Sequence, residues 1–275
     1  MTLPAYDVCG QGDVTVLLLH GIGGGRSIWA DAASGTASAI AAAGCRAVAV
    51  DLPGYGGSAA MGPPDMDALV AAVDHLITFL AAPRVVLLGH SMGGMVAQEL
   101  VARAPRRVQG LVLACTSASF GKPDGDWQAR FVAERLAPLD AGLGMAGMAH
   151  ALVPGLLVPG LLAPFASDHA RQVATALMTG VPESTYRGAL AAIAGFDRRE
   201  ALADIHMPVL CLAGEHDRTA PPEVMQRLAS RIDGAEFVCL PGAGHIANLE
   251  QSAAFNAAVV SFLQRHFSLA HGANQ

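Results

Sequence analysis

A five-residue segment, Gly89-His90-Ser91-Met92-Gly93, contains the residues of this chain that are best suited to carry out chemistry. It follows a strand-like apolar run, Val85–Leu88, and matches Gly-x-Ser-x-Gly, the pattern of a nucleophile elbow. In this sharp strand-to-helix turn the serine hydroxyl is exposed, and glycines flank it because side chains there would collide with the neighbouring strand or helix. The pattern therefore predicts that Ser91 is a nucleophile.

Because glycine and serine are common, the same pattern also arises by chance in a strand followed by a Gly/Ser loop, so the flanking sequence has to decide. After the serine, Met95–Arg103 has apolar residues at helical spacing, and Pro105 follows as a stop signal. A strand before the serine and a helix after it form the context that a nucleophile elbow requires.

A serine nucleophile needs a general base within hydrogen-bond reach and an acid that orients this base. In the chain order typical of this elbow, serine, then acid, then histidine, the candidates are Asp217 and His245. Each follows a strand-like run, Val209–Ala213 and Glu236–Leu240 respectively. Glu215 is a local competitor for the acid, and Asp217 alone would also fit an Asx turn. The other histidines after the serine are less well placed: His150, His169, His206, His216, His266 and His271.

Acyl chemistry also needs two backbone N–H donors for the negative charge that develops on the attacked carbonyl oxygen. We expect one from Met92, directly after the nucleophile, and one from Ile22 in the Gly-rich loop His20–Gly25. This loop partly matches a dinucleotide-binding fingerprint, but Arg26 stands in place of the third glycine. The acidic residue expected about twenty positions further on is also missing. We therefore predict an oxyanion hole, with no metal and no organic cofactor.

Strand-like and helix-like segments alternate along two parts of the chain, which predicts an α/β fold with a mostly parallel sheet flanked by helices. We assign residues 1–118 and 205–275 to this α/β core. Residues 119–204 contain no convincing strand, and we interpret them as a helical cap over the ligand site. The expected strands are Val14–Leu19, Arg46–Val50, Val85–Leu88, Val108–Ala114, Val209–Ala213 and Glu236–Leu240. The expected helices include Ser34–Ala43, Met66–Leu80, Pro222–Arg231 and Ala253–His266.

Composition narrows the class of partner. The 275 residues are 52% hydrophobic and carry a formal net charge of −6 without basic runs, which argues against nucleic acid. Met1–Gly12 lacks a signal-peptide pattern, and the apolar stretch Leu143–Phe165 contains three prolines, so no membrane partner is expected. Three cysteines in strand-like runs suggest reduced core residues of a cytoplasmic protein: Cys115, Cys211 and Cys239. We expect a small-molecule ester or lactone substrate. The sequence leaves open whether the chain forms a homodimer.

Together the motifs resemble the α/β-hydrolase superfamily, from His20-Gly21 through Asp51–Ser58 and the elbow to Gly244-His245. This resemblance implies the α/β-hydrolase fold with a helical cap inserted after the sixth strand, and it gives Asp51 no catalytic role. It implies the catalytic triad and the oxyanion donors from residues already named: Ser91, Asp217, His245, Ile22 and Met92. One departure is the short N-terminus, with room for about one strand before Val14 where the superfamily usually has two.

Within the superfamily, the C-terminal segments Gly214–Asp217 and Gly242–Glu250 are most similar to the 3-oxoadipate enol-lactonase and carboxylesterase branch. The meta-cleavage C–C hydrolases are a close alternative, but His90 and Ile246 stand where they usually have asparagine and tryptophan. A dicarboxylate lactone would need a cation in the pocket, whereas the apolar cap suits a less charged ester. The candidate cations are Arg130, Arg135, Arg171 and Arg187.

The expected function is that of a serine hydrolase acting on a carboxylic ester or lactone through an acyl-enzyme. A C–C hydrolase with the same triad is the first alternative. A non-catalytic small-molecule receptor on the same fold is the second, and a degraded triad would favour it, whereas all three residue types are present here.

Overall fold

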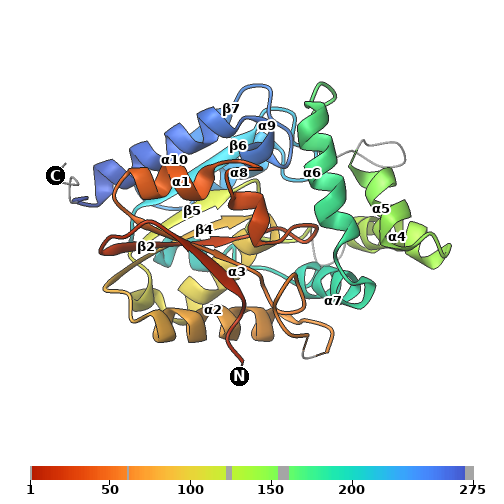
Figure 1. Cartoon of the computed structure of the whole chain (residues 1–275), viewed down its shortest axis with the longest axis horizontal. Helices are drawn as coiled ribbons and strands as arrows, with labels where there is room; N and C mark the ends of the chain where they lie inside the picture. The colour runs from red at the N-terminus through yellow and green to blue at the C-terminus, as the bar shows by residue number, and fades with distance from the viewer. Residues whose placement is uncertain (1, 61, 122–125, 154–160, 270–275) are drawn as a thin grey trace.

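The computed structural model describes residues 2–60, 62–121, 126–153 and 161–269, and these form one seven-stranded sheet flanked by helices (Figure 1). The strand order is β1-β3-β2-β4-β5-β6-β7, and all neighbouring pairs are parallel except the antiparallel pair β1 and β3. The strands are β1 (Tyr6–Cys9), β2 (Val14–Leu19), β3 (Arg46–Val50), β4 (Arg84–His90), β5 (Gly110–Ala114), β6 (Val209–Gly214) and β7 (Glu236–Leu240). The expected mostly parallel α/β sheet is confirmed.

Helices cover both faces of the sheet, which explains why the central strands are almost entirely apolar. α1 packs on α10 on one face and α2 packs beside α3 on the other (Figure 1). The helices of the core are α1 (Thr36–Ala42), α2 (Met66–Leu80), α3 (Met92–Arg103), α8 (Pro222–Ala229), α9 (Ala247–Glu250) and α10 (Ser252–His266). Short 3-10 helices cover Arg26–Trp29, Pro105–Arg107 and Ala201–Asp204.

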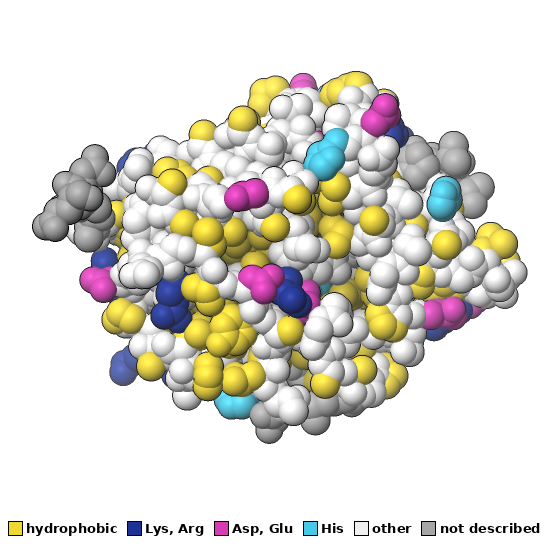
Figure 2. Space-filling model, viewed as in Figure 1, with side chains coloured by type: hydrophobic (Ala, Val, Ile, Leu, Met, Phe, Trp, Pro, Cys, Tyr) yellow, Lys and Arg dark blue, Asp and Glu magenta, His cyan; other side chains and the backbone are white. Residues whose placement is uncertain are grey.

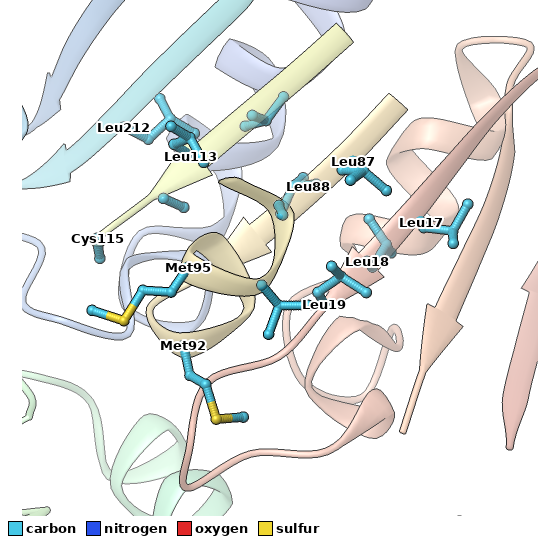
Figure 3. Close-up of a cluster of buried hydrophobic side chains, with 14 of the residues drawn as sticks. Leu17, Leu18, Leu19, Leu87, Leu88, Met92, Met95, Leu113, Cys115 and Leu212 are labelled. Atoms are coloured by element: carbon cyan, nitrogen blue, oxygen red, sulfur yellow. The ribbon is translucent and has the colours of Figure 1, made fainter. Parts of the chain in front are cut away.

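A cluster of buried hydrophobic side chains lies where α3 packs against the central strands (Figure 3). Leucines of β2, β4, β5 and β6 are fully buried there, and Met92 and Met95 extend from the first turn of α3. Since closely packed interiors resist displacement, this cluster makes a rigid base for the turn that carries Ser91. The labelled leucines are Leu17, Leu18, Leu19, Leu87, Leu88, Leu113 and Leu212.

A group of four helices separates β5 from β6 and lies together at one end of the sheet, on the right in Figure 1. They are α4 (Asp126–Asp140), α5 (Gly144–Leu152), α6 (Asp168–Thr179) and α7 (Glu183–Ala194). Within the described parts of 119–204 there is no strand, only an isolated bridge between Ser119 and Asp197. The helices agree with the segment expected at 119–204, while its role as a cap stays a prediction.

Two expectations need correction. The helical segment follows the fifth strand of the chain and not the sixth, because β1 is the one strand that precedes β2 among the described residues 2–13. This single strand is what the short N-terminus predicted. Cys239 is exposed on the edge strand β7, whereas Cys115 and Cys211 are buried as expected.

Among the described residues, no helix has both the length and the apolar character needed to cross a membrane. Of the apolar stretch Leu143–Phe165, residues 154–160, with Pro154 and Pro159, lie outside the described part of the chain. On the face shown in Figure 2, basic and acidic side chains are dispersed among neutral and hydrophobic ones.

Candidate active site

Ser91 lies in the tight turn between β4 and α3, with backbone angles φ 51° and ψ −116°. A non-glycine residue rarely adopts a positive φ, so the neighbours must hold this conformation. The two flanking glycines permit the packing that does so. A Cβ atom at Gly89 would overlap the carbonyl of Gly93, and one at Gly93 would overlap the carbonyl of Leu19 in β2.

Hydrogen bonds from the end of β5 hold the same turn. The Ser91 amide donates to the carbonyl of Ala114 at 2.9 Å. The Thr116 hydroxyl donates to the carbonyl of Ser91 at 2.8 Å. Both backbone groups of the serine are thus satisfied, and its hydroxyl stays free to point away from the sheet.

The three residues predicted as a triad lie in one hydrogen-bonded row. His245 Nε2 lies 3.0 Å from Ser91 Oγ, and His245 Nδ1 lies 2.8 Å from Asp217 Oδ2. The other carboxylate oxygen of Asp217 accepts the amides of Thr219 at 2.8 Å and Ala220 at 2.9 Å. The structure therefore brings together side chains that are up to 154 positions apart in the chain.

Electrostatics determine the proton positions in this row. Burial opposes ionisation of Asp217, but its charge interaction and hydrogen bond with His245, together with two backbone amides, outweigh burial and lower the pKa of Asp217. The resulting carboxylate accepts a hydrogen bond from Nδ1–H of His245. The ring nitrogen without a proton, Nε2, then faces Ser91 with its lone pair. This arrangement can remove the proton from a serine hydroxyl as the oxygen attacks an electrophile.

Two residues near Asp217 in the sequence, Glu215 and His216, make their contacts outside the row of Ser91, His245 and Asp217. Glu215 accepts the backbone amide of Gly242 at 2.9 Å and is exposed. His216 is also exposed and contacts the Phe165 ring edge-on, with ring centres 4.9 Å apart. Neither side chain lines the cavity described below.

His90, the residue before the nucleophile, supports the loop of His245. Its Nε2 lies 2.7 Å from the His245 carbonyl, which can only accept, so this nitrogen carries the proton. Burial, together with the neighbouring His245, lowers the pKa of His90 to about 3, and the ring stays neutral. This role gives no local signal in the sequence, because the partner lies 155 residues away.

Glu250 links the same loop to the helical segment. Its carboxylate accepts the amide of Ala163 at 2.7 Å and the amide of Ile246 at 3.1 Å. The His245 amide in turn donates to the carbonyl of Leu161 at 2.8 Å. Residues just before α6 therefore hold the histidine loop in place.

Of the two predicted oxyanion donors, Met92 directly follows Ser91, and Ile22 lines the same cavity as Ser91. Met92 is the first residue of α3, and its side chain is fully buried, so it can serve the site only through its backbone. Ile22 lies in a loop held by two bonds, from the Tyr55 hydroxyl to its carbonyl at 3.0 Å and from Gly24 N–H to Gly21 O at 3.0 Å. Within the described residues, neither amide donates to another protein group. Both remain available to an anionic oxygen.

Asp51, to which the resemblance gave no catalytic role, anchors this loop. Its buried carboxylate accepts the amides of Arg26 at 2.7 Å and Gly57 at 2.9 Å, and it pairs with the Arg26 guanidinium. The arginine that interrupts the dinucleotide-like pattern thus ties the loop to the end of β3.

Ser91 opens into a cavity of about 650 Å³ between the sheet and the helical segment. Ile22 and His245 line it as well, while Asp217 and Met92 do not. Most of the helical lining is apolar or aromatic: Trp127, Phe131, Leu177, Met178, Tyr186 and Leu190. Of the four arginines that the sequence offered, Arg135 lines the cavity, and Arg130, Arg171 and Arg187 do not.

The sequence profile of the alpha/beta hydrolase family matches residues 16–258. This chain belongs to the alpha/beta hydrolase family. A provisionally named carbamate hydrolase, RutD, of Variovorax paradoxus is 32% identical over 94% of this chain and 96% of its own. A pimeloyl-acyl-carrier-protein methyl ester esterase of Yersinia enterocolitica is 29% identical over 94% of this chain and 97% of its own.

Among solved structures, the enol-lactonase of Burkholderia xenovorans superposes on this hydrolase with a TM-score of 0.77 and 28% identity. The match covers 94% of this chain and 96% of the lactonase. The resemblance to the enol-lactonase and carboxylesterase branch is thereby confirmed. Family membership and these relatives support hydrolase activity.

We predict that His90→Leu lowers the free energy of unfolding of this hydrolase by about 1–3 kcal/mol, because the buried His245 carbonyl then loses its donor. Urea unfolding followed by circular dichroism measures this difference. The control is His169→Leu, at an exposed position of α6. Equal stability of the two variants would contradict the supporting role of His90.

Proposed function

We propose that this alpha/beta hydrolase cleaves a carboxylic ester or lactone through an acyl-enzyme formed on Ser91. The observation that carries the proposal is the continuous row of Ser91, His245 and Asp217, with the serine at the wall of a cavity. A serine hydroxyl, an imidazole within hydrogen-bond reach of it and a buried carboxylate that orients the imidazole are the parts that acyl transfer on serine requires.

In the proposed reaction, His245 takes the proton of Ser91 as its oxygen attacks the substrate carbonyl. Asp217 holds the ring and stabilises the imidazolium that forms. The amides of Ile22 and Met92 stabilise the oxyanion of the tetrahedral intermediate. His245 then gives its proton to the leaving oxygen. In a second half-reaction, water activated by His245 releases the acid and restores the serine.

The relatives favour this substrate class. One is named as a methyl ester esterase and another as an enol-lactonase, and both names describe cleavage of a carbon–oxygen bond at a carbonyl. The apolar and aromatic lining of the cavity suits a small organic substrate.

Replacing the nucleophile tests the proposal directly. We expect Ser91→Ala to lower kcat for 4-nitrophenyl butyrate by roughly 10⁴-fold or more while the protein stays folded. The matched control is Ser117→Ala, because Ser117 lines the same cavity and its hydroxyl donates to the Ser119 carbonyl. Initial rates and far-UV circular dichroism of the three proteins decide the outcome. Wild-type turnover by Ser91→Ala would refute the proposal.

The orienting acid gives a second test. Asp217→Asn keeps the size of the side chain but favours the wrong tautomer of His245, so we expect kcat to fall by roughly 10⁴-fold with little change in KM. Glu215→Gln is the control, since Glu215 is exposed outside the cavity lining, where it accepts the amide of Gly242 and lies 3.5 Å from Nε2 of His216. An equal loss of kcat in both variants, or none in Asp217→Asn, would exclude Asp217 as the orienting acid.

A further inference from the structure

Among the described residues that line the cavity beside Ser91, Arg135 of α4 is the one deeply buried cation, with only 6% of the residue exposed. Arg135 is more deeply buried than the other arginines of the cavity lining, which are half-buried or exposed: Arg199, Arg218, Arg227 and Arg231. A charge this far from bulk water has to find its compensation locally.

Arg135 has no acidic partner within the part of the chain that the structure describes. It makes no ion pair there, whereas Arg187 of α7 pairs with both Glu183 and Asp140. Its guanidinium carbon lies 4.6 Å from the ring centre of Phe131, and the side chain of Tyr186 lies beside it. An aromatic ring and a neutral hydroxyl compensate a buried charge only in part.

The charge itself persists. Burial lowers the pKa of Arg135, while nearby Tyr186, Glu134 and Asp217 act in the opposite direction. A guanidinium nevertheless remains protonated at neutral pH. Arg135 lines the same cavity as Ser91 and His245.

The face of α4 that lines the cavity carries aromatic side chains at one end and a charged side chain further along. Trp127, Phe131 and Arg135 are spaced four residues apart, so they project from the same face of the helix. Trp127 is 45% exposed, Phe131 is half-buried and Arg135 is buried. An aromatic wall at the outer end therefore leads inward to a cation.

We propose that Arg135 binds a carboxylate carried by the ester or lactone substrate, so that this hydrolase prefers anionic substrates with an apolar body. The planar fork of a guanidinium matches a carboxylate through two parallel hydrogen bonds. The aromatic side chains of α4 would cover the apolar part of the molecule while its carbonyl reaches Ser91. This inference rests on the proposed esterase or lactonase function and specifies its substrate class.

Two pairs of esters test the preference. The first is mono-4-nitrophenyl adipate with 4-nitrophenyl hexanoate, which differ by a carboxylate in place of a terminal methyl group. The second is 4-carboxyphenyl hexanoate with phenyl hexanoate, which moves the charge to the leaving group. We expect kcat/KM to favour the anionic member of at least one pair by roughly ten- to a hundredfold. Equal or lower values for the anionic members of both pairs would overturn the proposal.

Variants of the arginine identify the source of the preference. Arg135→Met should remove it, and Arg135→Lys should keep part of it, because a lysine retains the charge without the fork. Two controls should keep the full preference: Arg130→Met, at an exposed position of α4 outside the cavity lining, and Arg218→Met, at an exposed position within the lining. Loss of the preference in Arg218→Met with retention in Arg135→Met would overturn the assignment.

A purely structural Arg135 predicts a different result. Its loss would then lower kcat/KM for both members of a pair by the same factor, and an unchanged ratio would overturn the proposal. The Ser91→Ala variant separates this test from the proposed function. If Ser91→Ala still hydrolyses these esters, the acyl-enzyme mechanism is refuted. The effect of Arg135→Met on the ratio of kcat/KM between the anionic and the neutral ester is a separate measurement, so the two proposals can fail independently.

Discussion

The candidate site depends on the close backbone packing of the serine turn against the carboxyl ends of the central strands. The first turn of α3 approaches β2 so closely that Gly93 has no room for a side chain beside the Leu19 carbonyl. On the other side, Ala114 and Thr116 bond to both backbone groups of Ser91. Together these contacts hold a non-glycine residue at a positive φ, a conformation that persists only when its surroundings overdetermine it.

The parallel sheet brings the remaining groups to the same place. β6 and β7 end at the edge where β4 ends, so the loops that follow them present Asp217 and His245 toward the serine. The helical segment also supports the site, because Leu161 and Ala163 take part in the bonds that hold the histidine loop. A displacement of this segment would therefore also disturb the position of His245.

Much of this arrangement could be predicted from the sequence, because its signals are local. The strands Val14–Leu19 and Glu236–Leu240 and the helix Met66–Leu80 have the predicted bounds, and the glycines at the elbow specify a turn that few other residues permit. What sequence could not predict depends on tertiary packing. Arg130 and Arg135 lie on the same helix, yet which of them is buried depends on how α4 packs against its neighbours α5 and α7.

The partner of His90 and the exposure of Cys239 were hidden for a related reason. The carbonyl that His90 bonds is remote in the chain, and a cysteine in an apolar run gives no sign that its strand lies at the edge of the sheet. Short sequence windows report which elements form, whereas long-range contacts decide what each side chain meets.

The central claim is that Ser91 is an activated nucleophile, and covalent labelling measures this most directly. The protein is treated with a fluorophosphonate at neutral pH, digested, and mapped by mass spectrometry. The account predicts one adduct per chain, located on the peptide that contains Ser91 and absent from the Ser91→Ala variant. A folded protein that stays unlabelled, as a non-catalytic receptor would, or an adduct on another serine of the cavity, would contradict it.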